Sequence, residues 1–509
     1  MRTMLATHNV LAVSAAAAED HINEPLAPDV AMLVDLSDVI NLARRRETNA
    51  DEAMGKEEPD VIYDLGGLAN GTFNFNKAQP QHVAFLAAFA LGSVSTAAAG
   101  TGYQHTITPI AGDLDTARSN PSFSAVQRLG NSVAKRLFAS CFVDRLTLTW
   151  AKDSWLKAAG EITGTGYHQE NLVFEEVAGF EDDTSVTLAA NAVEGATAAA
   201  RLDSVHHAEF KASGDNFWQK ATVTAASAAT PAVLTVTALS ASHTAGTWRI
   251  LYVPDEDTSL DTGSATANPP NDTTGVLTDA GGTMTPDAQI GRWLVMTSGT
   301  ANGRIWKITD NTATTITCAG INLYAAGVRS GDTYKIVQFG WLPLPALVTE
   351  TPLRVTALYL YVGGEWNGSA FEGGWQLDAP LREIAWTFQN NLEPEFTPGS
   401  GVPDYADRAL RSGRTQTVSI NQDCRDWLMQ QRLSDNETFG VYALCEGPEY
   451  EAGHKYQVEC IWPMVGLLQA DIGVTDKRLT QAPELQVLEH DTYGSVIVKV
   501  KNKQAAYAA

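Results

Sequence analysis

Apolar and polar residues alternate along two stretches in the last third of the chain. Residues 381–389 (LREIAWTFQ) place Ile384, Trp386 and Phe388 on one side of an extended strand and mostly short polar residues on the other. Residues 415–420 (TQTVSI) repeat this alternation. A period of two is typical of a strand with one buried and one hydrated face. The pattern therefore predicts two strands, joined by a long polar loop.

A similar alternation occurs between residues 138 and 166. Leu146, Leu148 and Trp150 alternate with threonines, and the tetrapeptide AKDS follows as a turn. Residues 156–163 then alternate in the same way. This predicts a β-hairpin whose polar face is again rich in threonine.

Two segments have the pattern of helices. Residues 80–92 (PQHVAFLAAFALG) begin with proline and end with glycine, which suits the first turn and the end of a helix. We expect one face of this helix to pack on the core and His82 to lie near its solvated start. Residues 423–433 (DCRDWLMQQRL) predict a second, amphipathic helix.

The N-terminal part carries weaker signals. Residues 31–46 are read as a strand followed by a helical turn, and residues 61–75 as strands with Asn70-Gly71 as a hairpin turn. Residues 44–60 are so charged that they predict a solvated loop, or an arm that docks on a neighbouring copy.

A change in composition near residue 183 divides the chain. Residues 183–339 are rich in Ala, Thr, Ser and Gly, and carry little of the net charge of −24. Within them, residues 218–253 and 305–337 resemble one another, which suggests two small β units, 183–253 and 275–338, joined by a linker. We therefore expect an inserted module at 183–339 between two parts of one domain, 1–182 and 340–509.

The overall charge restricts the possible partners. The 509 residues include 35 basic and 59 acidic ones, so binding of nucleic acid by neutralising phosphates is not expected. The five cysteines form no CxxC pair, which argues against a structural zinc site or a disulfide scaffold and favours reduced thiols in a cytoplasm. Residues 10–18 are apolar, but His8 and Asn9 precede them, and we expect neither a signal peptide nor a membrane span.

No constellation for catalysis, a metal or a cofactor stands out. The chain contains no GxxxxGK[ST], HExxH or GxSxG motif, so we expect no enzyme and no cofactor. One alternative is a surface β-sandwich protein that binds carbohydrate. Its candidate platform consists of three tryptophans and two glutamates: Trp366, Trp375, Trp386, Glu365 and Glu372.

Several blocks resemble tail tube proteins of long-tailed bacteriophages. They are residues 132–166 (SVAKRLFASCFVDRLTLTWAKDSWLKAAGEITGTG), 383–401 (EIAWTFQNNLEPEFTPGSG), 408–420 (RALRSGRTQTVSI) and 485–502 (LQVLEHDTYGSVIVKVKN). The resemblance implies a mainly β, β-sandwich-like subunit with a flanking α-helix. It further implies strands that contribute to a ring-wide β-barrel and a β-rich decoration at 183–339. In that family, hexameric rings stack head-to-tail into a tube in the virion tail, assembled in the host cytoplasm.

The resemblance also implies partners and a candidate surface. The tube would hold the tape-measure protein, contact the tail terminator and the tail-tip or baseplate proteins, and conduct genomic DNA without specific binding or membrane insertion. The charged segments 44–60 and 393–414 suit contacts between rings. The predicted lumen-facing residues are the polar positions of the alternating strands: Thr147, Thr149, Glu161, Thr163, Glu383, Thr387, Gln389, Thr415, Thr417 and Ser419.

Overall fold

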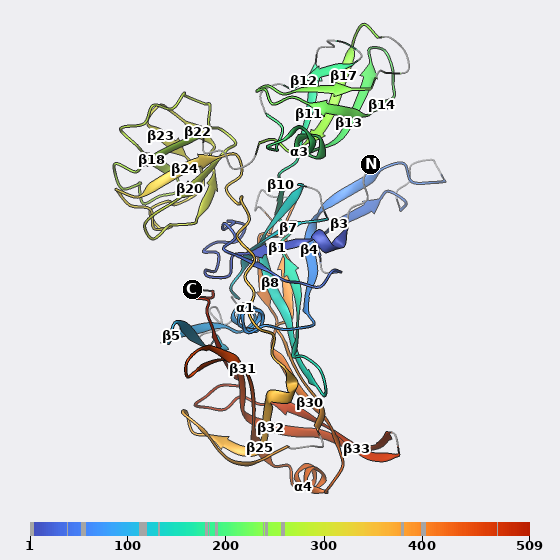
Figure 1. Ribbon diagram of the computed structural model, residues 1–509, viewed down its shortest axis with the longest axis vertical. Coiled ribbons are helices and arrows are strands. Elements are labelled where there is room, and N and C mark those ends of the chain that lie inside the picture. The colour runs from blue at the N-terminus through green and yellow to red at the C-terminus, as the bar shows by residue number, and fades with distance from the viewer. Residues whose placement is uncertain are drawn as a thin grey trace.

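The computed structural model is built mainly of β-strands arranged in several antiparallel sheets (Figure 1). This confirms the mainly β class predicted from the alternating patterns. The structure describes residues 5–37, 39–51, 57–110, 120–130, 133–178, 182, 184–188, 192–237, 239, 243–255, 260–377, 381–398, 404–475 and 477–508.

In the described part of the chain, one sheet of 18 strands forms the body of the molecule. Its strands are β1 (Val10–Val13), β2 (Val30–Met32), β3 (Ile40–Thr48), β4 (Ile62–Phe75), β5 (Gly92–Ala99), β6 (Gly102–Pro109), β7 (Phe123–Arg128), β8 (Lys135–Ala151), β9 (Lys157–Gly164), β10 (His168–Glu170), β25 (Leu358–Trp366), β26 (Phe371–Gln376), β27 (Leu381–Gln389), β30 (Thr415–Asp423), β31 (Thr438–Glu451), β32 (His454–Thr475), β33 (Arg478–Val487) and β34 (Ile497–Asn502). Among the described residues, this sheet takes no strand from positions 173–337.

The sheet folds over so that two of its layers share one core. One layer runs β4-β9-β8-β27-β30-β33, and the other runs β26-β25-β31-β32-β34-β6-β5. The long strand β32 also pairs with β33 and so joins the two layers. Trp386 of the first layer meets Trp462 of the second edge-on, with ring centroids 5.8 Å apart. Both rings are fully buried, so the apolar sides of the alternating strands face each other.

Helix α1 (Pro80–Leu91) fills the core beside these layers. Proline occupies its first turn, and Gly92 ends it in the left-handed conformation with φ 92°, as the sequence predicts. The helix is buried on every side, not only on one face. The expectation of a solvated start is therefore wrong: His82 is buried, and its Nδ1 accepts a hydrogen bond from the backbone N–H of Gln79.

Strand β4 shows why Asn70-Gly71 is not a turn. The strand runs without interruption through this pair, and Gly71 lies opposite Ile40 of β3. A Cβ at Gly71 would stand 2.8 Å from the carbonyl oxygen of Val39, so glycine here permits close approach of the two strands. The helical turn predicted within residues 31–46 is also wrong, because the second part of that segment, from Ile40 onward, belongs to strand β3.

The predicted loops and second helix are also revised. Residues 44–48 belong to β3, so the charged segment 44–60 is the outer part of a β-hairpin arm, of which residues 52–56 lie outside the described residues. The segment 393–414 contains the two-stranded hairpin β28 (Leu392–Glu395) and β29 (Arg408–Arg411), and its residues 399–403 are outside the described part. Helix α4 (Leu428–Asp435) begins five residues later than predicted, because Asp423 ends strand β30.

Two units with identical strand topology make up the middle of the chain. The first unit, residues 173–252, has sheets β11-β17-β13-β14 and β12-β16-β15, and the second unit, residues 261–337, has sheets β18-β24-β20-β21 and β19-β23-β22. The elements are β11 (Val173–Ala178), β12 (Ser185–Thr187), α3 (Ala198–Asp203), β13 (Val205–Ala212), β14 (Gln219–Ala221), β15 (Val223–Ala226), β16 (Val233–Val236), β17 (Gly246–Tyr252), β18 (Asp261–Ser264), β19 (Val276–Thr278), β20 (Trp293–Met296), β21 (Ile305–Lys307), β22 (Asp310–Asn311), β23 (Thr315–Thr317) and β24 (Thr333–Val337).

Each unit has its own apolar core and begins earlier than composition indicates. Strand β11 precedes residue 183, which itself lies outside the described residues, and β18 lies within the predicted linker. In both units the first strand pairs with the last, so Val173 lies opposite Tyr252 and Asp261 lies opposite Ile336. The chain therefore enters and leaves each unit at neighbouring points.

The second unit packs against the body through an apolar cluster. Trp293, Val295, Ile305 and Val337 of this unit meet residues of β7 and β8 and of the segment that follows the unit: Val126, Leu137, Phe339, Trp341 and Leu342. Beside the cluster, Arg304 forms an ion pair with Asp20. In Figure 1 the two units lie at one end of the body, on either side of its long axis.

Candidate channel-lining face

Strand register places the ten predicted lumen residues on one continuous face of the first layer. Thr147 of β8 lies opposite Thr387 of β27, which lies opposite Thr417 of β30. A second row runs from Thr149 through Ala385 to Ser419. The remaining predicted residues occupy neighbouring rows on these strands and on β9: Glu161, Thr163, Glu383, Gln389 and Thr415. We call this surface the hydroxyl-rich face.

Burial separates the two sides of these strands clearly. Every predicted lumen residue is partly or fully exposed in the single chain. Their neighbours along the strands are fully buried in the main core: Leu146, Leu148, Trp150, Ile384, Trp386, Phe388, Val418 and Ile420. The alternation read from the sequence therefore corresponds to one dry and one wet side.

The charges on the face largely compensate one another. Arg145 donates a hydrogen bond to Glu161 across 2.7 Å and another to Gln389 across 3.1 Å, so its charge is paired. Lys157 is the other basic residue of β8 and β9 on this face, and it is exposed at the start of β9 opposite Thr149. The face thus offers hydroxyls and amides with little positive charge.

The face extends over two further strands that the sequence analysis missed. On β4, Asn70 and Thr72 lie opposite Thr163 and Glu161. On β33, Gln486 lies opposite Thr417, and Glu484 lies opposite Ser419. The alternation in TFNFN (residues 72–76) was a usable signal, but reading Asn70-Gly71 as a turn concealed it.

Two hairpin arms expose apolar side chains at the ends of this layer. On the arm formed by β3 and β4, Ile62 is 65% exposed and Tyr63 and Leu65 are also exposed. On the arm formed by β32 and β33, Val474 is 72% exposed and lies opposite the exposed Leu479. Two-stranded ribbons with such surfaces are marginal in isolation, so both arms are suited to contact another molecule.

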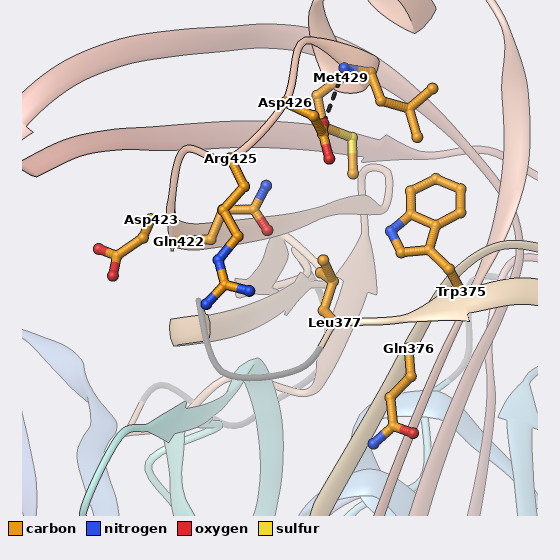
Figure 2. Close-up of a pocket in the computed structure, with 9 residues that line it drawn as sticks. Trp375, Gln376, Leu377, Gln422, Asp423, Arg425, Asp426 and Met429 are labelled. Atoms are coloured by element: carbon orange, nitrogen blue, oxygen red, sulfur yellow. Dashed lines mark hydrogen bonds between the residues drawn. The ribbon is translucent and has the colours of Figure 1, made fainter.

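A small cavity of about 180 Å³ lies beside α4 (Figure 2). Trp375 stands at one end and Asp423 at the other. The Asp423 carboxylate is held by Arg382 at 2.8 Å and also lies 3.6 Å from Arg478, so it is committed to ion pairs. The lining contains no nucleophile with a neighbouring base, and we assign no chemistry to it.

The tryptophan platform of the carbohydrate-binding alternative is not formed. Trp386 is fully buried in the main core and Trp366 is buried as well. The guanidinium of Arg432 covers Trp375, 4.7 Å from the ring centroid. Glu365 and Glu372 lie opposite each other on β25 and β26. The three indole rings therefore offer no common surface for a sugar.

Two comparisons of the sequence with known proteins found no match. No protein-family model matches the sequence, and no curated protein matches it significantly. Among the described residues, no three metal-binding side chains come together, and no helix has the length and apolar character needed to cross a bilayer.

Proposed function

We propose that the chain is a structural virion protein that assembles into stacked hexameric rings, which form the tail tube of a long-tailed bacteriophage. The observation that carries this proposal is the hydroxyl-rich face. Six adjacent strands present mostly short polar side chains to water over one continuous surface, and a β-sandwich-like subunit could add such a surface to a ring-wide barrel.

The chemistry of this face suits passage of DNA. Each phosphate that a cation neutralises adds to binding and makes release slower. With Arg145 paired to Glu161, a wall of threonine, serine, glutamine and a few glutamates leaves the backbone of DNA hydrated and unbound. In the assembled tail the same wall would surround the tape-measure protein before DNA passes.

The exposed arms support association between copies. Arg44, Arg45 and Arg46 are exposed along β3, which pairs only with β4 among the described strands. An unpaired strand edge and exposed apolar residues favour association with another molecule, which would bury them. Contacts of unlike surfaces, repeated head-to-tail, propagate a filament. Tail terminator and tail-tip proteins would cover the surfaces left at the two ends.

The two middle units fit a decoration outside the bore. They contribute no strand to the large sheet within the described residues, and each has a separate core. We therefore expect their removal to leave tube formation intact.

Negative-stain electron microscopy of the purified chain tests the proposal. Rings and long tubes are expected, whereas a protein that stays monomeric at high concentration contradicts it. Ile62→Asp with Tyr63→Asp should give rings that do not stack, because the arm would then carry charge into the contact between rings. Phe217→Asp, at an exposed position of the first unit, is the matched control and should leave tubes unchanged.

The lumen assignment has its own test. Replacing Thr147, Thr387 and Thr417 by lysine puts one basic row across the face, and tubes of this variant should retain DNA in a gel-shift assay. Tubes in which the same residues are serine should not retain it. Equal DNA retention by the two variants would contradict placement of this face in the bore.

A further inference from the structure

A cleft of about 600 Å³ opens on the outer side of the second layer of the body. It is formed by strands β25, β26, β31 and β32 and by the turn between β25 and β26. Leu360, Val441 and Val458, on the inner sides of these strands, belong to the core shared with Trp386. The cleft therefore faces away from the hydroxyl-rich face, across the thickness of the body.

Aromatic rings form the floor of this cleft and are held on rigid strands. Phe371 stacks on Tyr442 with ring centroids 5.4 Å apart and an interplanar angle of 23°. Tyr361, directly opposite Tyr442 in the sheet, lies 6.0 Å from it. Tyr359 borders the cleft and is 42% exposed. These rings make a pre-formed apolar surface that needs no rearrangement to receive a flat ligand.

Hydrogen-bonding groups surround the rings. Glu459 accepts hydrogen bonds from Lys499 at 3.5 Å and Gln457 at 3.4 Å, and Glu446 accepts one from Lys455 at 3.0 Å. Both carboxylates are thus fixed in position and keep lone pairs for further donors. Within the described part of the chain, the hydroxyls of Tyr359 and Tyr361 make no hydrogen bond, which leaves them available to a ligand.

This combination matches the chemistry of a sugar. The ring of a pyranose has an apolar C–H face, which packs on an aromatic ring, and a rim of hydroxyls, which donate to carboxylates. A cleft of this volume lies in the range of small-ligand sites. Its lining holds two carboxylates and no basic side chain, and the neighbouring lysines are already paired with Glu446 and Glu459, so an anionic ligand would find no unpaired cation at the cleft.

We propose that the cleft between β25, β26, β31 and β32 binds an uncharged oligosaccharide. The aromatic floor would hold the sugar faces, and Glu446, Glu459 and the tyrosine hydroxyls would receive or donate hydrogen bonds to the hydroxyls. If the hydroxyl-rich face lines a bore, this cleft lies on the outside of the tube. The site itself does not depend on tube formation, because one chain supplies all of its lining residues.

The test uses the full-length chain and isothermal titration calorimetry with maltohexaose, cellohexaose and chitohexaose. We expect saturable binding of at least one of the three, and no binding of a hyaluronan hexamer, which carries carboxylates. Tyr359→Ala should weaken binding by about tenfold or more, because it removes a stacking surface without opening the core. Phe217→Ala, which removes an exposed aromatic ring from the first middle unit, is the matched control and should bind as the unmodified protein does.

Any one of the following results would overturn the proposal. They are failure of all three neutral probes to bind, equal binding by Tyr359→Ala and the unmodified protein, and preferential binding of hyaluronan. A cleft that is instead an interface between copies would show a changed assembly state in Tyr359→Ala without saccharide binding, which also overturns it. Electron microscopy of the same samples reports tube formation separately, so loss of one function is distinguishable from loss of the other.

Discussion

The two middle units share a topology but differ in the surface they turn outward. In the first unit, Glu209 of β13 lies between Lys220 and Arg249 of the neighbouring strands. At the equivalent place in the second unit, Val295 of β20 lies between Ile305 and Lys335. The second unit therefore has an apolar outer sheet and packs on the body, whereas the first has a charged one.

The charged side chains on the outer sheet of the first unit find their partners within the unit itself. Arg249 lies 3.9 Å above the ring centroid of Trp218 and forms ion pairs with Glu176 at 2.6 Å and Glu209 at 3.9 Å. Inner positions are apolar in both copies, as Trp248 and Tyr334 show. The comparison teaches that inner positions preserve the fold, while a few outer positions decide whether a copy docks on the body.

The substitution with the largest expected effect, Trp248→Ala, tests whether the first unit folds independently. Trp248 is fully buried beside Phe210, and Trp248→Ala should cost about 3–5 kcal/mol, which is comparable to the whole stability of a small domain. Limited proteolysis with mass spectrometry should then show cleavage within residues 173–252 and an intact body. Cleavage spread over the whole chain would contradict independence of the units.

A matched pair of substitutions tests the outer positions. Ile305→Glu places a carboxylate in the apolar cluster and should weaken packing of the second unit on the body by about 3–4 kcal/mol. Lys220→Glu, at the equivalent position of the first unit, is exposed and should change stability by less than about 0.5 kcal/mol. Differential scanning calorimetry measures both, and similar effects of the two changes would remove the distinction between the outer sheets.

Glu350 of the body and His206 of the first unit should contribute to stability with opposite dependences on pH. Burial raises the pKa of Glu350 from 4.5 to about 7, despite hydrogen bonds from the backbone N–H groups of Lys503 and Gln81. The folded body then holds a proton that the unfolded chain releases, so the contribution of Glu350 to stability should fall by up to roughly 3 kcal/mol between about pH 4.5 and 7. Buried His82 in the same body, whose pKa burial lowers to about 3, contributes in the opposite direction. Burial lowers the pKa of His206, so the first unit should lose stability as pH falls below 6.5.

Denaturant titrations at several pH values, with tryptophan fluorescence and proteolysis as readouts, check this prediction. In Glu350→Gln the stability of the body should change with pH in the direction set by His82, rising from about pH 4.5 toward 6.5 more steeply than in the unmodified protein. If the stability of that variant depends on pH as in the unmodified protein, other buried carboxyls such as Glu19, and not Glu350, cause the dependence.

The smallest effect concerns the ion pair beside the docking cluster. Arg304 and Asp20 are partly exposed, so Asp20→Asn should reduce the stability of the docked arrangement by about 0.5–1 kcal/mol, and less at high salt. Calorimetry at low and high ionic strength measures this. A loss as large as that of Ile305→Glu would mean that charge, rather than apolar contact, holds the second unit in place.

Alternation and turn residues were sufficient to predict much of the body. The wet positions of β8 and β27 follow from a period of two, and Pro80 and Gly92 mark the ends of α1. What local pattern cannot supply is register between distant strands: Thr147 and Thr387 are neighbours although 240 residues separate them. The sequence therefore predicted which residues share a side, and the structure shows which of them meet.

The errors share a physical origin in long-range contacts. Asn70-Gly71 has the composition of a turn, but β3 packs so closely there that only glycine fits within a strand. Strands β11 and β18 were missed because charged or short segments become strands only when β17 and β24 pair with them. His82 was expected at the surface because one helix face was treated as solvated, whereas the body surrounds α1 on all sides.

The adjacency of Val173 and Tyr252 has a practical consequence. A domain whose N- and C-terminal ends lie side by side can be replaced by another domain, because the rest of the chain keeps the same two connection points. Foreign domains with adjacent termini are therefore suitable replacements for the first unit. If the chain assembles into a tube, every subunit would then display one foreign domain, and these domains would be regularly spaced along the tube.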